Sequence, residues 1–338
     1  MSTPRVFIIA EAGVNHNGSP DTAKALVRAA SDAGADAVKF QTFKAEAIAS
    51  QTARKASYQE RTSRPDETQY AMLKKLELSV EVHQELMHLC DGLGIEFLSS
   101  AFDRDSADLL DELGVTQFKL GSGEITNLPL LVHVAAKRKP LILSTGMATL
   151  GEVEEAVEAI TAAGNTRLTL LHCVTEYPAP VDEVNLNAMR TLKKAFGYPV
   201  GYSDHSDGSA VAIAAAALGA AVIEKHLTLK RGDPGPDHRA SMEPDQFAAM
   251  VRAIRDVEMA LGDGRKRPAP CELGNMIAAR KSLVAACDIP AGTRLSQEMI
   301  AVKRPGSGIK PKYFDRVIGR TARRAIAADE LIGWENLA

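Results

Sequence analysis

The amino-acid sequence predicts a parallel (β/α)8 barrel followed by a small β-rich domain. Three observations lead to this fold class: eight short apolar runs recur along the chain, an amphipathic segment follows each run, and the pattern changes to short strand-like pieces after about residue 280. No Gly-x-Gly-x-x-Gly follows the first run, and polar residues end all eight runs. A closed barrel is therefore favoured over an open doubly wound sheet.

The eight predicted strands follow one another at the spacing of βα units. Continuous apolar runs are typical of parallel strands that are buried on both faces. The runs cover residues 6–10, 37–40, 95–99, 117–120, 141–144, 168–172, 200–202 and 222–224. The first predicted helix covers residues 20–34 and the last covers residues 244–261. The polar stretch 51–65 is long for a βα connection, which predicts a loop that covers an active site.

The chain divides by composition into three parts. Residues 1–262 form the predicted barrel domain, and residues 263–280 read as a linker because Gly, Pro and basic residues are concentrated at its start. Residues 281–338 form the predicted β-rich domain. With 338 residues, of which 45% are hydrophobic, the chain can build one large core and a second, smaller one.

Charge and composition exclude several classes of partner. The net charge of -3 provides no basic field for nucleic acid, so we expect a small ligand. The sequence has no signal peptide and no apolar run long enough to cross a bilayer, which predicts a cytoplasmic protein without a membrane partner. The four cysteines lack the spacing of a metal site or a disulfide framework.

Reactive side chains stand at the ends of the predicted strands. The carboxyl ends of barrel strands form the active face, so His205 and His226, about twenty residues apart at successive strand ends, are expected to be neighbours. Two imidazoles with carboxylates nearby suit a divalent transition metal. Lys39, Lys119, several hydroxyl groups and the turn 121–123 predict a site for a phosphate. The substrate is therefore expected to be anionic.

An alternative interpretation applies to the charged residues. Lys39 and Lys119 are alternatively ion-pair partners of Glu11, Glu124 or Glu224 at the barrel mouth, without a ligand. Tyr177 is alternatively a packing residue.

The motifs at these strand ends resemble those of the sialic acid synthases, which make N-acetylneuraminate, legionaminate and related nonulosonic acids. The resemblance covers nearly the whole chain, and the segment 303–306 is similar to part of the antifreeze-like (SAF) domain of these enzymes. The matching motifs are residues 10–18, 38–42, 119–124, 143–147, 172–178, 201–205, 223–226 and 235–237.

The resemblance implies a TIM barrel with a C-terminal SAF domain and a specific reaction. Phosphoenolpyruvate condenses with an open-chain N-acetylmannosamine-type sugar and water to give a nine-carbon acid and phosphate, by C–O cleavage. The sugar is N-acetylmannosamine or 2,4-diacetamido-2,4,6-trideoxymannose. The resemblance also implies a divalent metal that polarises the sugar aldehyde, with Mn²⁺ preferred over Mg²⁺ or Co²⁺. It implies a domain-swapped homodimer as well.

The resemblance also assigns roles to individual residues. The implied metal ligands are His205 and His226. The implied catalytic residues are Glu11, Lys119 and Asp237. The implied phosphoenolpyruvate ligands are Lys39, Ser100, Lys119, Ser122, Ser144 and Ser203. The implied sugar ligands are Gln41, Glu124, Tyr177, Asp237 and Arg304, the last from the SAF domain of a second subunit; its alternative interpretation is a solvated surface charge.

Two other functions remain open on the residues alone. A Schiff-base aldolase would use Lys39 or Lys119 as its nucleophile. A carbohydrate-binding protein without catalysis is the third hypothesis, although a cluster of ionisable groups at strand ends favours an enzyme.

Overall fold

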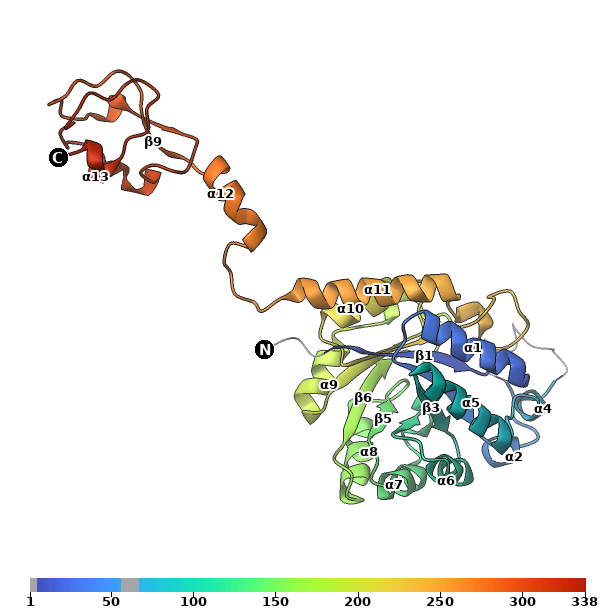
Figure 1. Ribbon diagram of the computed structural model, residues 1–338. Coiled ribbons are helices and arrows are strands. Elements are labelled where there is room, and N and C mark those ends of the chain that lie inside the picture. The colour runs from blue at the N-terminus through green and yellow to red at the C-terminus, as the bar shows by residue number, and fades with distance from the viewer. Residues whose placement is uncertain (1–4, 56–66) are drawn as a thin grey trace. The chain divides into compact units, whose positions relative to one another are not determined.

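A closed eight-stranded parallel barrel forms the larger part of the molecule, which confirms the predicted fold class (Figure 1). The computed structural model describes residues 5–55 and 67–338. Part of the predicted loop 51–65 therefore lies outside the described residues. The strands pair in sequence order: β1 (Phe7–Gly13), β2 (Ala37–Thr42), β3 (Glu96–Ala101), β4 (Phe118–Leu120), β5 (Leu141–Ser144), β6 (Leu168–Cys173), β7 (Val200–Asp204) and β8 (Val222–His226).

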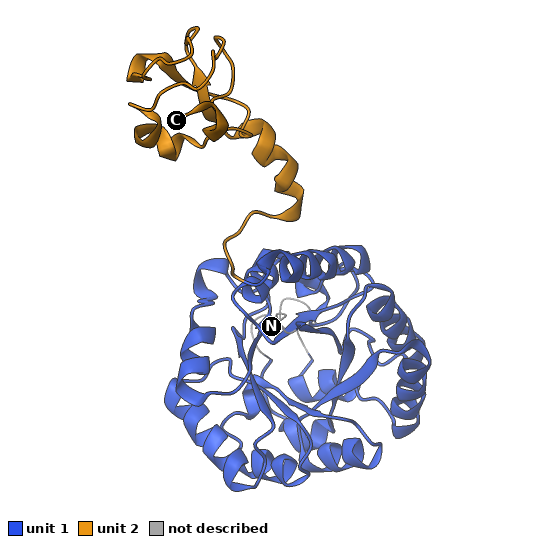
Figure 2. Cartoon of the chain, turned by 60° about the vertical axis from the view of Figure 1, so that its left-hand side comes forward, with its two compact units in different colours: residues 1–263 blue, residues 264–338 orange. Residues whose placement is uncertain are grey.

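Helices surround the barrel as an outer ring (Figure 2). Several begin at the polar caps Ser19, Ser79, Asp103 and Thr149, each of which accepts a backbone N–H of the first turn. The helices of this ring are α1 (Pro20–Asp32), α2 (Ala45–Ile48), α4 (Gln69–Lys74), α5 (Val80–Leu93), α6 (Arg104–Glu112), α7 (Leu128–Ala136), α8 (Leu150–Ala162), α9 (Ala188–Phe196), α10 (Ala210–Ala217) and α11 (Pro244–Leu261).

Several strands extend further than the apolar runs predicted. β1 continues through Glu11, β2 through Gln41, and β8 through Glu224 to His226. The ladder pairs backbone groups whatever the side chain, so polar residues continue a strand when the neighbouring strands do the same. Glu11 consequently lies opposite Lys39 on one side and His226 on the other.

The inside of the barrel is layered. An apolar layer consists of one inward side chain from each of six strands, namely Ile9, Ala37, Leu98, Ile142, Leu171 and Val222. Because side chains alternate along a strand, the next inward position lies two residues further on, and there the residues are polar. Gly201 faces this layer, since a Cβ there would lie 2.7 Å from Leu171 Cδ2 and 2.8 Å from Val222 Cβ. Apolar side chains therefore fill the barrel interior beneath the polar side chains, which lie toward the carboxyl ends of the strands.

The C-terminal part of the chain forms its own compact unit, residues 264–338, after a first unit of residues 1–263. The predicted linker 263–280 contains α12 (Leu273–Ala279). In the second unit β9 (Ser282–Ala285) pairs antiparallel with β10 (Ile300–Lys303), and α13 (Phe314–Val317) follows. Its separate core includes Leu283, Leu295, Val317 and Ile332.

Within the described part of the chain, no helix has both the length and the apolar character needed to cross a membrane.

Candidate active site

A cavity of about 430 Å³ opens at the carboxyl ends of the barrel strands. Every residue that the sequence analysis assigned to the site lines this cavity, with the exception of Arg304. Arg304 belongs to the second unit, where its Nε donates to the carbonyl oxygen of Ala279. The barrel therefore brings together strand ends that are more than two hundred residues apart in the sequence, such as Glu11 and His226.

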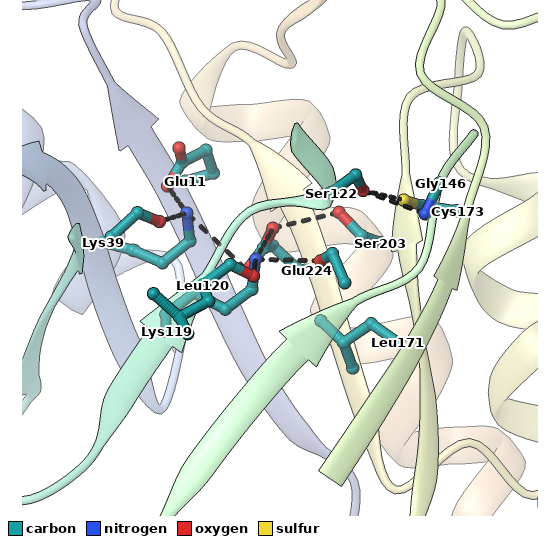
Figure 3. A network of polar contacts seen from close by, with 12 residues as sticks. Glu11, Lys39, Lys119, Leu120, Ser122, Gly146, Leu171, Cys173, Ser203 and Glu224 are labelled. Carbon is teal, nitrogen blue, oxygen red and sulfur yellow. Dashed lines mark hydrogen bonds and ion pairs between the residues drawn. The ribbon is translucent and has the colours of Figure 1, made fainter. Parts of the chain in front are cut away.

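Two lysines and two glutamates form a buried network at the floor of the cavity (Figure 3). Lys39 Nζ lies 2.7 Å from Glu11 Oε2 and 3.7 Å from Glu224 Oε2, and it donates to Ser100 Oγ at 2.9 Å. Lys39 is therefore an ion-pair partner of Glu11 and Glu224, as its alternative interpretation predicted. A site for an anion requires in addition that these contacts can give way to a ligand.

Lys119 completes the network from β4. Its Nζ donates to Ser144 Oγ at 2.9 Å and lies 3.5 Å from Glu224 Oε1, which in turn accepts from Ser203 Oγ at 2.9 Å. Glu224 therefore stands between the two lysines. The sequence analysis named Glu224 only as an alternative ion-pair partner of the lysines, and its place two residues before His226 is the signal that puts it on the inward face of β8.

Burial and pairing act in opposite directions on these four groups. Burial favours the neutral form of Glu224, but Lys119 and Lys39 overcome it and hold the pKa of Glu224 at about 2. Burial also opposes the charge on Lys39, yet Glu11 and Glu224 raise the pKa of Lys39 above its ordinary value. For Lys119 burial prevails and lowers the pKa. Lys39 and Glu224 are therefore ionised at neutral pH.

His205 and His226 lie side by side at the ends of β7 and β8, with their rings edge to face. Their ring centroids lie 5.5 Å apart, and the ring of Tyr177 lies 4.2 Å from that of His205. Burial lowers the pKa of His205 to about 4 and that of His226 well below the ordinary value, so both imidazoles are neutral at pH 7. Neutral imidazole is the form that binds a metal.

Hydrogen bonding orients the two rings. His205 Nδ1 donates to the carbonyl oxygen of Val174 at 2.6 Å, which leaves Nε2 as the acceptor. His226 Nδ1 is buried without a hydrogen-bond partner among the described residues and lies 3.9 Å from Asp237 Oδ2. Across residues 5–55 and 67–338, no three His, Cys, Asp or Glu side chains form a group arranged to hold a metal. The two imidazoles fit a divalent ion whose other positions are taken by water or substrate oxygen.

Two carboxylates approach the histidines from the β1 side. A bulge in the pairing of β1 with β2 separates Glu11 from Gly13, where φ is +53°. A Cβ at Gly13 would lie 3.2 Å from Glu11 Oε1, 3.4 Å from Asp237 Oδ2 and 3.4 Å from Gln41 Nε2. These three side chains therefore converge beside the bulge. Burial and the neighbouring Glu11 raise the pKa of Asp237 to about 7.

The β4 to β6 side of the cavity is also polar. Ser122 Oγ accepts from the backbone N–H of Gly146 at 2.9 Å and lies 3.0 Å from Cys173 Sγ. Thr175 Oγ1 is buried without a hydrogen-bond partner in the described structure. Cys173 and Thr175 line the cavity, although the sequence analysis assigned neither of them to the site.

Apolar side chains form another part of the lining that the sequence did not indicate. They come from the ends of β1, β2 and β3 and from the short helices α2 and α4. We call this surface the apolar wall; its members are Val14, Phe43, Ile48, Met72, Leu73, Leu76 and Phe102. No motif marks them, because apolar residues at these spacings are also typical of ordinary core positions.

Comparisons with known proteins agree with the fold. A family model described as the NeuB family matches residues 26–266, and one described as the SAF domain matches residues 280–338. The N,N'-diacetyllegionaminic acid synthase of Campylobacter jejuni is 50% identical over 330 residues, covering 97% of this chain and 99% of its own. The N,N'-diacetyllegionaminic acid synthase of Legionella pneumophila is 47% identical over 340 residues, covering 99% of this chain and 96% of its own.

A solved structure extends the likeness to three dimensions. The crystal structure of the N-acetylneuraminic acid synthetase of Leptospira borgpetersenii, 34% identical, superposes with a TM-score of 0.71 and covers 81% of this chain and 91% of that one. The resemblance to sialic acid synthases that the strand-end motifs indicated is thereby confirmed. This chain belongs to the NeuB family and carries a C-terminal SAF domain.

Proposed function

We propose that the protein is a cytoplasmic nonulosonic acid synthase. It condenses phosphoenolpyruvate with an N-acetylated mannose-type aldehyde and water, and it releases phosphate by cleavage of the C2–O bond. One observation carries the proposal: a single cavity combines two buried lysines on its floor with two neutral, neighbouring imidazoles at its mouth. An anion and an electrophilic carbonyl oxygen are the ligands that these two groups of residues suit.

The floor of the cavity provides the site for phosphoenolpyruvate. Lys39 and Lys119 face the phosphate and carboxylate, and hydroxyl groups complete the site. Glu11 and Glu224 form ion pairs with the lysines before the ligand binds, so the buried positive charges are compensated. The hydroxyl groups of this site belong to Ser100, Ser122, Ser144 and Ser203.

The mouth of the cavity provides the site for the aldehyde. His205 and His226 would hold a divalent metal, preferably Mn²⁺ and otherwise Mg²⁺ or Co²⁺, which would supply Lewis-acid polarisation of the carbonyl oxygen. Asp237, with a pKa of about 7, is placed to deliver a proton to that oxygen as C3 of phosphoenolpyruvate forms the new bond to C1 of the sugar. Glu11 is placed to accept a proton from the water that adds at C2.

The names of the relatives and the remaining polar residues of the cavity support a choice of sugar substrate. Both relatives at about half identity are named N,N'-diacetyllegionaminic acid synthase, which supports 2,4-diacetamido-2,4,6-trideoxymannose over N-acetylmannosamine. Gln41, Glu124 and Tyr177 line the cavity and offer amide, carboxylate and phenol groups for sugar hydroxyls and acetamido groups. Arg304 binds the acyl group from the SAF domain of a second subunit in a domain-swapped homodimer.

The test is phosphate release from phosphoenolpyruvate by metal-stripped protein, with and without Mn²⁺, in the presence of either sugar. We expect release only with both metal and sugar, and faster release with 2,4-diacetamido-2,4,6-trideoxymannose. If neither sugar supports phosphate release with Mn²⁺, Mg²⁺ or Co²⁺, the proposal is refuted.

The Schiff-base aldolase is tested in the same samples. The lowered pKa of Lys119 favours a nucleophilic amine there. Metal-independent turnover together with borohydride trapping at Lys119 would establish the aldolase, whereas no trapping is expected of the synthase.

A further inference from the structure

The apolar wall is a continuous surface built from several elements. Val14, Phe43, Met72 and Leu76 pack together in a small buried cluster, and Ile48, Leu73 and Phe102 pack against it while they remain partly exposed. The rings of Phe43 and Phe102 meet edge to face, with centroids 6.1 Å apart. This cluster is separate from the barrel core, and its members line the cavity.

The rest of the cavity differs in chemistry from the apolar wall. The floor carries Lys39, Lys119 and Glu224, and the β4 to β6 side carries Glu124 and Thr175. A sugar hydroxyl group on those sides can form hydrogen bonds with side-chain donors and acceptors. A hydroxyl pressed against the apolar wall would give up its hydrogen bonds to water without replacement, whereas a methyl group would gain from burial.

The position of the reacting groups determines which end of the sugar meets the wall. The aldehyde carbon, C1, must lie at His205 and His226, on the ends of β7 and β8. The wall begins one strand further around the barrel, at the end of β1, and continues past β2 and β3. A six-carbon open chain that starts at the histidines therefore reaches the wall with its far end, C6.

We propose that the apolar wall binds C6 of the sugar and selects a 6-deoxy sugar, which ends in a methyl group, over a sugar that ends in a hydroxymethyl group. This inference rests on the proposed function and adds the residues that choose the substrate. Leu73 of α4 and Ile48 of α2 are the specificity-determining residues that we single out, because both are apolar, partly exposed and in the lining.

The experiment compares two sugars that differ in one oxygen atom. Steady-state kinetics are measured with 2-acetamido-2,6-dideoxymannose and with N-acetylmannosamine, at saturating phosphoenolpyruvate and Mn²⁺. We expect kcat/KM of the wild-type protein to favour the 6-deoxy sugar by about 10-fold to 200-fold, the range in which an apolar pocket discriminates. A ratio near one, or a preference for N-acetylmannosamine, would overturn the inference.

Two variants on different helices report on the wall itself. Leu73→Asn and Ile48→Thr place a polar group in the wall, so we expect the preference to fall to less than about threefold, through a higher KM for the 6-deoxy sugar. The KM for phosphoenolpyruvate should not change. Val80→Asn is the control, because Val80 is an exposed apolar residue of α5 that does not line the cavity.

The outcomes separate the inference from the function on which it rests. If neither these sugars nor 2,4-diacetamido-2,4,6-trideoxymannose supports phosphate release by the wild-type protein, the proposed function fails and the inference fails with it. If release occurs but Leu73→Asn and Ile48→Thr keep the wild-type ratio, the inference alone fails. Thermal unfolding of each variant identifies a folding defect, and either helix suffices for the test.

Discussion

At the scale of single residues, Glu224 explains how the cavity tolerates two buried lysines. Glu224 lies on the inward face of β8 with 4% of its surface exposed, between Lys39 and Lys119. Its carboxylate neutralises cations that would otherwise be costly to bury. The same carboxylate repels an incoming phosphate, so the site exchanges an internal counter-ion for a ligand.

Replacement of Glu224 by glutamine is expected to change stability and ligand affinity in opposite directions. The free energy of unfolding should fall by about 3 kcal/mol, because one partner of a buried ion pair is lost while the other remains buried. Phosphoenolpyruvate should bind more tightly and raise the Tm more than in the wild type. Thermal unfolding with and without phosphoenolpyruvate measures both effects.

A surface pair provides the control for this prediction. Glu85 is half exposed and lies 2.6 Å from Lys24, so Glu85→Gln should change stability by less than about 1 kcal/mol. An unchanged Tm in Glu224→Gln, or a smaller gain from phosphoenolpyruvate than in the wild type, would contradict the counter-ion role.

At the scale of elements, β7 and β8 are tied together behind the two histidines. Asp204 and Lys225 are opposite each other in the register of the two strands and are fully buried. Lys225 Nζ donates to Asp204 Oδ2 at 2.8 Å and to the carbonyl oxygen of Ser206 at 2.6 Å. Both residues alternate with the inward-facing ones, so this pair lies outside the barrel interior. The pair holds the strand ends that carry His205 and His226.

Lys225→Met is expected to weaken metal binding more than substrate binding. The variant leaves Asp204 charged and buried, so stability should fall by about 3 to 5 kcal/mol. Loss of a group that orients metal ligands typically costs about 10-fold to 100-fold in metal affinity. Titration with Mn²⁺ measures this loss, and the KM for phosphoenolpyruvate should stay within about twofold.

The double variant Asp204→Asn with Lys225→Met distinguishes charge burial from positioning. It removes both charges, so stability should recover in part while the metal affinity remains low. Recovery of both quantities together would show that the pair contributes only to stability. Lys139→Met, which breaks a surface pair with Asp111, is the matched control.

At the scale of the whole molecule, charge is divided unequally between the two units. Residues 264–338 contain 14 Lys and Arg against 7 Asp and Glu, a net charge of +7. Residues 1–263 contain 26 Lys and Arg against 36 Asp and Glu, a net charge of -10. If two subunits exchange their SAF domains as proposed, the opposite net charges of the two units would favour the association.

Association of the subunits is therefore expected to depend on salt. Charges separated by more than about 10 Å are largely screened at 0.1 M salt. If the homodimer forms, we expect its Kd, measured by sedimentation equilibrium, to rise at least about tenfold between 0.05 and 0.5 M NaCl. Sucrose at equal osmolality should leave the Kd unchanged. A Kd that does not respond to salt would exclude electrostatic attraction as the basis of assembly.

Much of the fold and of the polar site was predictable from the sequence. Each parallel strand contains apolar residues in its first half that are buried in the barrel, which is why all eight strands were found, with their starts within one residue of those observed. Polar strand ends such as Glu11 and His226 were assigned to the cavity, yet several strands were ended too early, because the polarity of a residue conceals its backbone pairing.

The sequence by itself determined the order of the strands, the polar residues near their carboxyl ends and the family motifs, because these follow from local pattern along the chain. Only the tertiary structure decided that Glu224 separates two lysines and that Ile48, Leu73 and Phe102 form a wall of the cavity. Apolar spacing does not distinguish a side chain that faces a core from one that faces a ligand. That distinction depends on which distant elements pack against it.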